Sequence, residues 1–249
     1  MNHNNGDIWT DFADRVSGPG GSPRDHAIHN IRQRAAVQLR HNPSFHTLII
    51  NGETREMAVM AFAKKFNIKK LCALPGESIT HGGLVCWKNN HWIVTQIDAD
   101  DTAYESALMQ QCNYQLRWID AQGRRIEKWC IVEDGTKYLE GLYRFEMMEL
   151  GAARIAVTVA KDDDTKNLHR GDRFIIADPD VGEKLSYRIT KPNTLFNIFE
   201  DKGIYRYIMT ETVVEGEDNT LDSIAKDNPA LYPKDSVRYD DNNPEGAWL

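Results

Sequence analysis

The sequence lacks the closely spaced cysteine pairs that mark a structural zinc site. Its cysteines stand far apart, with no CxxC pair among them: Cys72, Cys86, Cys112 and Cys130. Zinc sites usually draw their ligands as close pairs, so this spacing speaks against one. The N-terminal segment also lacks the basic start and apolar core of a secretory signal, which makes disulfides unexpected. We therefore expect small, mostly buried thiols and no bound metal.

The chain also lacks a long apolar run and the familiar catalytic motifs. No segment approaches the roughly 20 apolar residues that a membrane-spanning helix needs. A GxSxG elbow, a glycine-rich phosphate loop followed by Lys-Ser/Thr, and an HExxH helix are all missing from the sequence. The composition, 41% hydrophobic and 27% charged, is typical of a globular protein. We expect a cytosolic-type protein that is not an enzyme and uses no cofactor.

The acidic charge is concentrated at the C-terminal end. Residues 211–249 hold ten acidic and three basic side chains, which accounts for the whole net charge of −7. The rest of the chain is balanced in sign, and this argues against a broad nucleic-acid-binding surface, which would need clustered lysine and arginine. We interpret residues 215–249 as a solvated acidic tail and the polar residues 1–21 as a flexible arm.

Residues 22–41 predict one amphipathic helix. Ser22 is a suitable N-cap, and Pro23 fits the first helical position. Pro43 pushes the residue before it out of the helical region, which ends the helix. The apolar stripe recurs at three- and four-residue steps and consists of Ile28, Ile31, Ala35 and Leu39. The basic surface opposite it, which we expect to be an interface, consists of Arg24, Arg32, Arg34 and Arg40.

The chain beyond the helix predicts short strands separated by turns. GLVCW and HWIVTQI flank Lys88, Asn89 and Asn90, which is a β-hairpin signature. Residues 112–118 alternate apolar and polar side chains, DAQG supplies a turn and RRIEKWCIV returns, so the stretch from residue 112 to 130 is expected to be a hairpin. The same alternation predicts three core residues, Trp92, Leu116 and Trp118.

A second β region follows ELGA. RIAVTVA, RFIIAD, KLSYRIT and GIYRYIMTET are four alternating strands with no helix between them, a pattern typical of a small sandwich or barrel. The sequence therefore predicts a mainly β protein with one N-terminal helix. We place its boundary near residues 149–152, between a helix plus barrel-like domain over residues 22–148 and a second β domain over residues 149–214.

Three features match binding sites only in part. AKDDDTKNLHRGD holds three successive aspartates, but the EF-hand spacing and its late glutamate are absent. His26 and His29 lie on one helical face and lack an evident third ligand. The tryptophans of the first β region leave open an aromatic platform for a sugar or single-stranded nucleic acid. These tryptophans are Trp87, Trp92, Trp118 and Trp129. Alternation places Trp92 and Trp118 on the apolar face of their strands, which we expect to face the core.

The order of these segments resembles a group of tailed-bacteriophage virion proteins at the head–tail junction, of the neck, head-closure or stopper type. The segments that carry the resemblance are NPSF and INGE after the helix, then HWIVTQID, CNYQLRW and TKY, then DDDTKNLHRGDRFIIAD, YRITKPNT and GIYRYIMTE. The resemblance spans about residues 24–225 and includes no catalytic motif. It implies that the C-terminal β domain, a sandwich, is immunoglobulin-like.

The resemblance implies a structural protein that forms a ring under the portal and joins or closes the filled head to the tail. Its partners would be further copies of itself, portal or adaptor ring proteins and tail proteins, with no membrane. Genomic DNA would pass through the channel without specific binding. The protein would be assembled in the host cytoplasm and reside in the virion. We expect an acidic loop to face the channel, where it would repel the DNA backbone, with the side chains Asp98, Asp100 and Asp101.

Three alternatives fit the same features of the sequence. The first is another tail structural protein, at tail completion or the tail tip. The second is a nucleic-acid-binding β barrel that uses the tryptophans and the arginine helix. The third alternative is a carbohydrate-binding module or hydrolase, which would need exposed coplanar aromatics or two convergent carboxylates. A nucleic-acid-binding barrel predicts strong, salt-dependent DNA binding, whereas a connector subunit predicts little.

Overall fold

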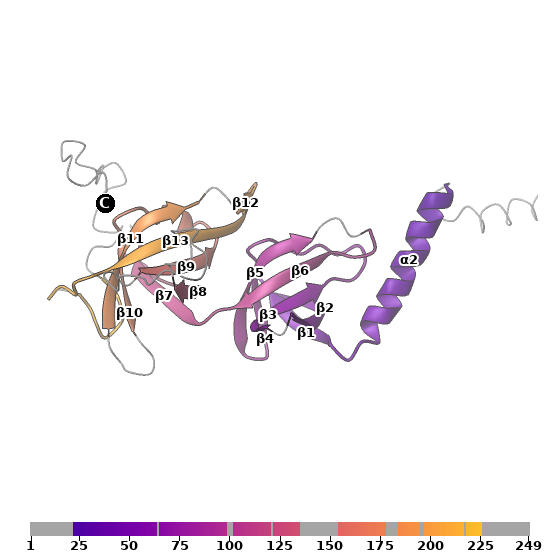
Figure 1. Cartoon of the computed structure of the whole chain (residues 1–249), viewed down its shortest axis with the longest axis horizontal. Helices are drawn as coiled ribbons and strands as arrows, with labels where there is room; N and C mark the ends of the chain where they lie inside the picture. The colour runs from indigo at the N-terminus through magenta and orange to yellow at the C-terminus, as the bar shows by residue number, and fades with distance from the viewer. Residues whose placement is uncertain are drawn as a thin grey trace, which may run out of the picture. The chain divides into compact units, whose positions relative to one another are not determined.

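Over the residues that the structure describes, the fold is mainly β with one N-terminal α-helix, which confirms the fold class expected from the sequence. A computed structural model describes residues 22–63, 65–98, 102–120, 122–134, 154–177, 184–194, 197–216 and 218–225. The chain forms two compact units that divide between Gln111 and Cys112. Figure 1 shows the helix and strands β1 to β6 of the first unit and strands β7 to β13 of the second.

Helix α2 spans Pro23–Arg40 and begins as its sequence predicts. Ser22 is the N-cap, and its hydroxyl oxygen accepts a hydrogen bond from the Asp25 backbone N–H at 3.2 Å. This cap satisfies one of the N–H groups that every helix leaves unpaired at its start. Only part of the expected apolar stripe is covered, because Leu39 is buried while Ile31 is 49% exposed.

The described part of the first unit contains a closed antiparallel barrel. Its strands are β1 (Phe45–Ile50), β2 (Glu53–Phe62), β3 (Lys65–Cys72), β4 (Leu84–Trp87), β5 (Asn90–Asp98) and β6 (Ser106–Gln111). They follow the order β1-β2-β3-β6-β5-β4, and β4 pairs with β1 to close the ring. Closure gives each strand a neighbour on both sides, so the barrel presents no open sheet edge.

Two tight turns fix the register of this barrel. Asn51 and Gly52 join β1 to β2 with φ of 51° and 86°, and Lys88 and Asn89 join β4 to β5 with φ of 50° and 60°. A two-residue hairpin of this kind needs positive φ at both positions to match the twist of its strands, and Asn and Gly reach it at low cost. The hairpin predicted at Lys88 is therefore confirmed.

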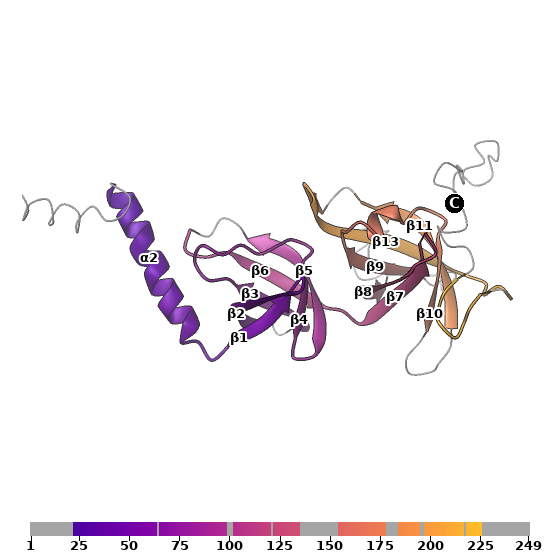
Figure 2. The same ribbon diagram turned by 180° about the vertical axis from the view of Figure 1, so that it is seen from behind.

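The described part of the second unit forms an antiparallel sheet that curls around its own core. Its strands are β7 (Tyr114–Ile119), β8 (Arg125–Asp134), β9 (Arg154–Ala160), β10 (Arg173–Ala177), β11 (Lys184–Asn193), β12 (Ile198–Phe199) and β13 (Lys202–Thr212). The order is β10-β11-β13-β9-β8-β7, with β12 paired to β13. The outer strands β10 and β7 approach each other (Figure 2), and the Ala177 backbone N–H donates to the Tyr114 hydroxyl at 3.0 Å. The sheet is thus a nearly closed, barrel-like layer.

The division between the units differs from the one expected at residues 149–152. That expectation assigned the β7–β8 hairpin to the first domain, over residues 22–148. In the structure β8 pairs with β9, with Val132 opposite Val157, so the hairpin belongs to the second unit. The second unit therefore begins at Cys112 and not at residue 149. Alternation indicates that a strand forms, but it does not indicate which strand lies beside it.

Each unit has its own hydrophobic core. Leu116 and Trp118 are buried in the second unit, where the rings of Trp118 and Phe174 meet edge to face with centroids 6.1 Å apart. Trp92 is buried in the barrel together with Val94. The three side chains that alternation placed in one β core are thus all buried, but they lie in two separate cores.

The first part of the expected acidic tail is folded onto the second unit. The Arg173 guanidinium on β10 is fully buried and lies 2.8 Å from the Asp218 carboxylate, which is also fully buried, and 3.1 Å from the Glu215 carboxylate. Ala225 is buried as well. The tail expected to be solvated from residue 215 is therefore anchored to β10 at Glu215 and Asp218, and residues 217 and 226–249 lie outside the described residues.

Replacing Arg173 with methionine should destabilise the second unit by roughly 3–5 kcal/mol, because the buried Asp218 carboxylate would lose its cation. Urea denaturation followed by circular dichroism measures the change. The double variant Arg173→Met/Asp218→Leu removes both charges and should regain most of the lost stability. A double variant as unstable as the single one would show that the ion pair does not anchor this segment.

Candidate functional site

The arginines predicted to form an interface are all exposed on helix α2. They are Arg24, Arg32, Arg34 and Arg40. The ion pairs among described residues involve other arginines, on the β-strands and their turns. Arg32 is positioned by a hydrogen bond from its Nε to the Thr102 carbonyl oxygen at 3.0 Å. The helix therefore presents positive charge that no described carboxylate balances.

Exposed apolar side chains alternate with two of these arginines along one row of the helix. Ile31, Arg34, Val37 and Arg40 follow at three-residue steps, and residues three apart are neighbours on a helix surface. Ile31 is 49% exposed and Val37 is 57% exposed. We call these four residues the α2 ridge. Its alternation of apolar and cationic side chains is suited to a protein partner that offers apolar surface and carboxylates.

The barrel holds the opposite side of the helix. Leu39 packs with Ala58 and Leu74, which belong to or directly follow barrel strands, and this small cluster is separate from the barrel core. Ala35 is also buried. These contacts lie in the C-terminal half of α2 and hold it against the barrel, while Ile31 and Val37 of the ridge stay about half exposed.

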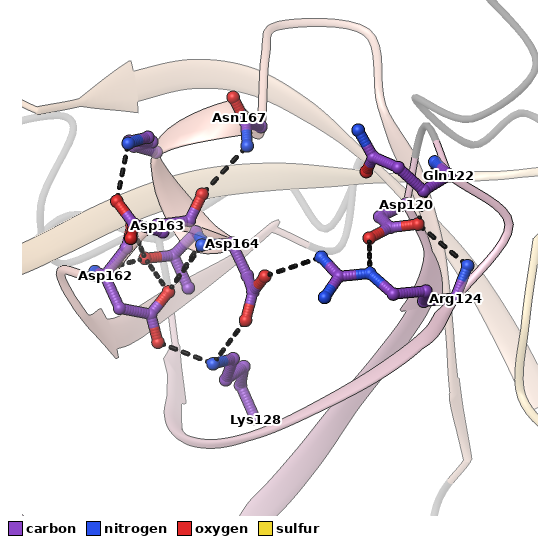
Figure 3. Close-up of polar contacts among 10 residues, drawn as sticks. Asp120, Gln122, Arg124, Lys128, Asp162, Asp163, Asp164 and Asn167 are labelled. Carbon is purple, nitrogen blue, oxygen red and sulfur yellow. Dashed lines mark hydrogen bonds and ion pairs between the residues drawn. The ribbon is translucent and has the colours of Figure 1, made fainter.

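A second polar cluster joins the β7–β8 hairpin to the loop that follows β9 (Figure 3). Lys128 Nζ lies 2.6 Å from Asp162 Oδ2 and 2.7 Å from Asp164 Oδ2. Arg124 Nε lies 2.6 Å from Asp120 Oδ2, and an Arg124 terminal nitrogen lies 3.5 Å from Asp164 Oδ1. Two cations from the hairpin thus hold the loop through its carboxylates.

The three successive aspartates are engaged within this loop. Asp162 Oδ1 accepts hydrogen bonds from the backbone N–H groups of Asp164 and Thr165 at 3.0 and 2.8 Å. Asp163 pairs with Lys166 at 2.5 Å. A calcium ion would have to displace lysine and arginine from these carboxylates. In the described ranges of the chain, no group of three or more His, Cys, Asp or Glu side chains is arranged to hold a metal ion.

The pKa shifts in this cluster favour its charged forms. Burial opposes the charge of Lys128, but hydrogen bonds to Asp162 and Asp164 outweigh it, and the pKa of Lys128 is raised. The hydrogen bond between Asp163 and Lys166 lowers the pKa of the carboxyl and raises that of the amine. Groups shifted in these directions stay ionised at neutral pH, which keeps their ion pairs intact, and we call this set of ion pairs the structural clamp.

The cysteines are thiols, and three of them are buried. Burial raises the pKa of the Cys112 thiol to about 12. Burial also raises the pKa of Cys130. Protonated, buried thiols are poor nucleophiles and poor metal ligands at neutral pH. The stretch between these two cysteines is therefore a structural β-hairpin, as its alternation predicts.

The tryptophans of the β region do not form an open aromatic platform. Trp92 and Trp118 are buried, and Trp87 and Trp129 are partly buried. Lys88 Nζ lies 4.7 Å from the centroid of the Trp87 ring, so a cation already occupies one face of that ring. The side chains that a sugar or base would stack on are thus largely covered by the protein itself.

The acidic loop expected to face a channel is described only at its edges. Asp98 ends β5 and is exposed. Asp100 and Asp101 lie outside the described residues. Thr102, where the described chain resumes, is the residue that receives the hydrogen bond from Arg32, so the end of this loop lies beside helix α2.

One exposed feature was missed by reasoning from the sequence. The tip of the β2–β3 hairpin carries Phe66, which is 91% exposed, with Lys65 before it and Lys69 and Lys70 behind it. The signal is the segment AFAKKFNIKK, residues 61–70, which holds four lysines and no acidic residue. The balanced charge of the chain outside its tail concealed this local cluster.

Comparison with known proteins identifies no family for the chain. It matches no protein-family model and no curated protein sequence. Two solved structures of K. pneumonia MrkH are similar over much of their length at 10% identity: the apo state covers 77% of this chain and 87% of that chain with a TM-score of 0.24, and the c-di-GMP complex covers 80% and 90% with a TM-score of 0.23. TM-scores this low carry no argument about the present fold or ligand.

No helix in the described ranges combines the length and apolarity needed to cross a bilayer.

Replacing Lys128 with methionine should lower the free energy of unfolding by about 1 kcal/mol at neutral pH, because two partly buried carboxylates would lose their cation. The folded-state pKa of Lys128 is raised, so its contribution is complete below the unfolded-state value of roughly 10.4. The contribution is lost as the pH rises through the higher folded-state pKa.

Urea denaturation of wild type and variant across neutral to strongly alkaline pH measures this difference. Lys191→Met is the control, since Lys191 is an exposed lysine on β11, and it should be almost silent. Equal stability of wild type and Lys128→Met at neutral pH would contradict the clamp.

Proposed function

We propose that this chain is a structural virion protein of a tailed bacteriophage, part of the neck ring that joins or closes the DNA-filled head to the tail. The order of its sequence segments resembles proteins of that position. The observation that carries the proposal is the α2 ridge, in which Ile31, Arg34, Val37 and Arg40 alternate in character and lie exposed on a helix that is fixed to a closed barrel.

The α2 ridge has the properties of an assembly contact. Its apolar members gain free energy when a partner covers them, and its arginines form charge-assisted hydrogen bonds with carboxylates. A helix ridge also fits into the groove of a partner helix. In a ring each copy presents one surface to a different surface of the next copy, and an exposed helix ridge suits such a head-to-tail interface.

The C-terminal segment of the chain is acidic in composition. Residues 211–249 hold ten acidic and three basic side chains, and part of that segment is anchored to the second unit through Asp218. The ridge of one copy would meet an acidic surface of the next copy, or of a portal, adaptor or tail protein. Such charge complementarity raises the association rate and selects the partner.

The rest of the chain has supporting roles in this proposal. The barrel and the curled second sheet, each with a filled core, act as rigid spacers between contacts. The loop that begins at Asp98 faces the channel, and genomic DNA passes it without sequence-specific binding. The protein acts without a cofactor and without enzymatic activity, and it resides in the virion.

The double variant Arg34→Glu/Val37→Asp should prevent incorporation of the chain into particles, because it places two carboxylates on a ridge that meets an acidic partner. Particles assembled with wild-type or variant chain are compared by negative-stain electron microscopy, and we expect separated heads and tails with the variant. Circular dichroism confirms that the variant is folded.

The charge-matched control Lys191→Glu/Lys202→Gln changes two exposed residues of the second unit and should leave tail-bearing particles at the wild-type level. The proposal fails if the ridge variant is incorporated as well as the control.

A further inference from the structure

We propose that the tip of the β2–β3 hairpin is a sequence-independent contact for nucleic acid. The inference rests on the described residues 61–63 and 65–70 alone and stands whether or not the chain is a neck protein. Its site would take the sugar–phosphate backbone through lysines and one base through an aromatic ring. Three observations carry it: the register of the hairpin, the exposure of Phe66 and the local charge.

The strand register is interrupted at the tip. Phe62 of β2 lies opposite Lys65 of β3, and the preceding residue, Ala61, lies opposite Lys69. Residues 66–68 of β3 therefore have no counterpart on β2 and form a bulge. Bulges bend a strand and redirect its side chains, and they are common beside functional sites.

This bulge displays Phe66 to the solvent. The side chain is 91% exposed, more than any other large apolar side chain among the described residues. The backbone is also strained beside the bulge, since Ala63 in the turn has φ of 44°, a region that residues with a Cβ rarely adopt. A single exposed apolar side chain is common on protein surfaces. Here the exposed side chain coincides with a bulge in its strand, and this combination indicates a functional role.

Three lysines lie close to Phe66 in the sequence: Lys65, which is exposed, and Lys69 and Lys70, which are partly exposed. Lys65 and Lys69 flank the bulge and lie opposite adjacent residues of β2, so the bulge brings their backbones together. Lys70 follows directly. The sequence from residue 57 to 76 contains no acidic residue. The ion pairs formed among described residues do not include these three lysines, so their charge is available to a polyanion.

This combination favours nucleic acid over a membrane. Lysines that neutralise phosphates supply sequence-independent affinity, and one aromatic ring is enough to stack one base. Attachment to a bilayer instead needs a larger apolar surface, and the residue next to Phe66 is the polar Asn67. Since the whole chain carries a net charge of −7, the contact should be weak and best seen at low salt.

The test is fluorescence anisotropy of the full chain with a labelled single-stranded oligonucleotide and with the corresponding duplex, over a series of salt concentrations. Binding should occur at low salt and should be tighter for the single strand, whose bases are open to stacking. The variant Lys65→Gln/Lys69→Gln/Lys70→Gln should reduce the slope of log affinity against log salt for the single strand by about 2.

Phe66→Ala should weaken single-strand binding roughly 10-fold and leave the salt slope unchanged, because it removes stacking and no charge. The controls are Phe199→Ala, an exposed phenylalanine at the β12–β13 turn, and Lys191→Gln/Lys202→Gln, which removes two exposed lysines of the second unit. Neither control should change affinity or slope.

Several results would overturn the inference. They are no binding at low salt, equal loss in the controls, or binding of wild type to vesicles of anionic phospholipid without binding to either oligonucleotide. None of these results bears on the α2 ridge, so a failure here and a failure of the proposed neck function can be told apart.

Discussion

The pairing of β8 with β9 is the contact on which the organisation of the chain depends. It places the Cys112–Cys130 hairpin in the C-terminal unit, where Trp118 packs against Phe174. It also brings Lys128 on β8 to the carboxylates of the loop after β9. Two features of the sequence that suggested metal sites were a stretch bounded by cysteines and three successive aspartates. In the structure they contact each other, through the ion pairs of Lys128 with Asp162 and Asp164.

Local structure was predictable from the sequence because local residues determine it. Ser22 caps the helix, and the turn at Lys88 and Asn89 has the expected positive φ values. Strand neighbours were not predictable, since alternation is the same whichever strand lies alongside. The buried Arg173 was not predictable either, because its carboxylate partner lies far along the chain in a segment that composition marked as solvated.

For the candidate surfaces too, the sequence predicted local features and missed those that depend on the folded structure. The arginines of α2 were found from the sequence because they belong to one helix with a regular period. The α2 ridge appeared only when the structure showed that Ile31, an expected member of the buried stripe, is exposed beside Arg34. The lysines around Phe66 were missed because charge was counted over long segments, and a balanced total conceals a cluster a few residues long.

Cryo-electron microscopy of particles that carry this chain tests the central claim most directly. The account predicts a ring of barrels between the portal and the tail, in which the α2 ridge of each copy lies against an acidic surface of a neighbour. Density for the chain at another position, or intact head–tail joints in particles that lack the chain, would contradict it.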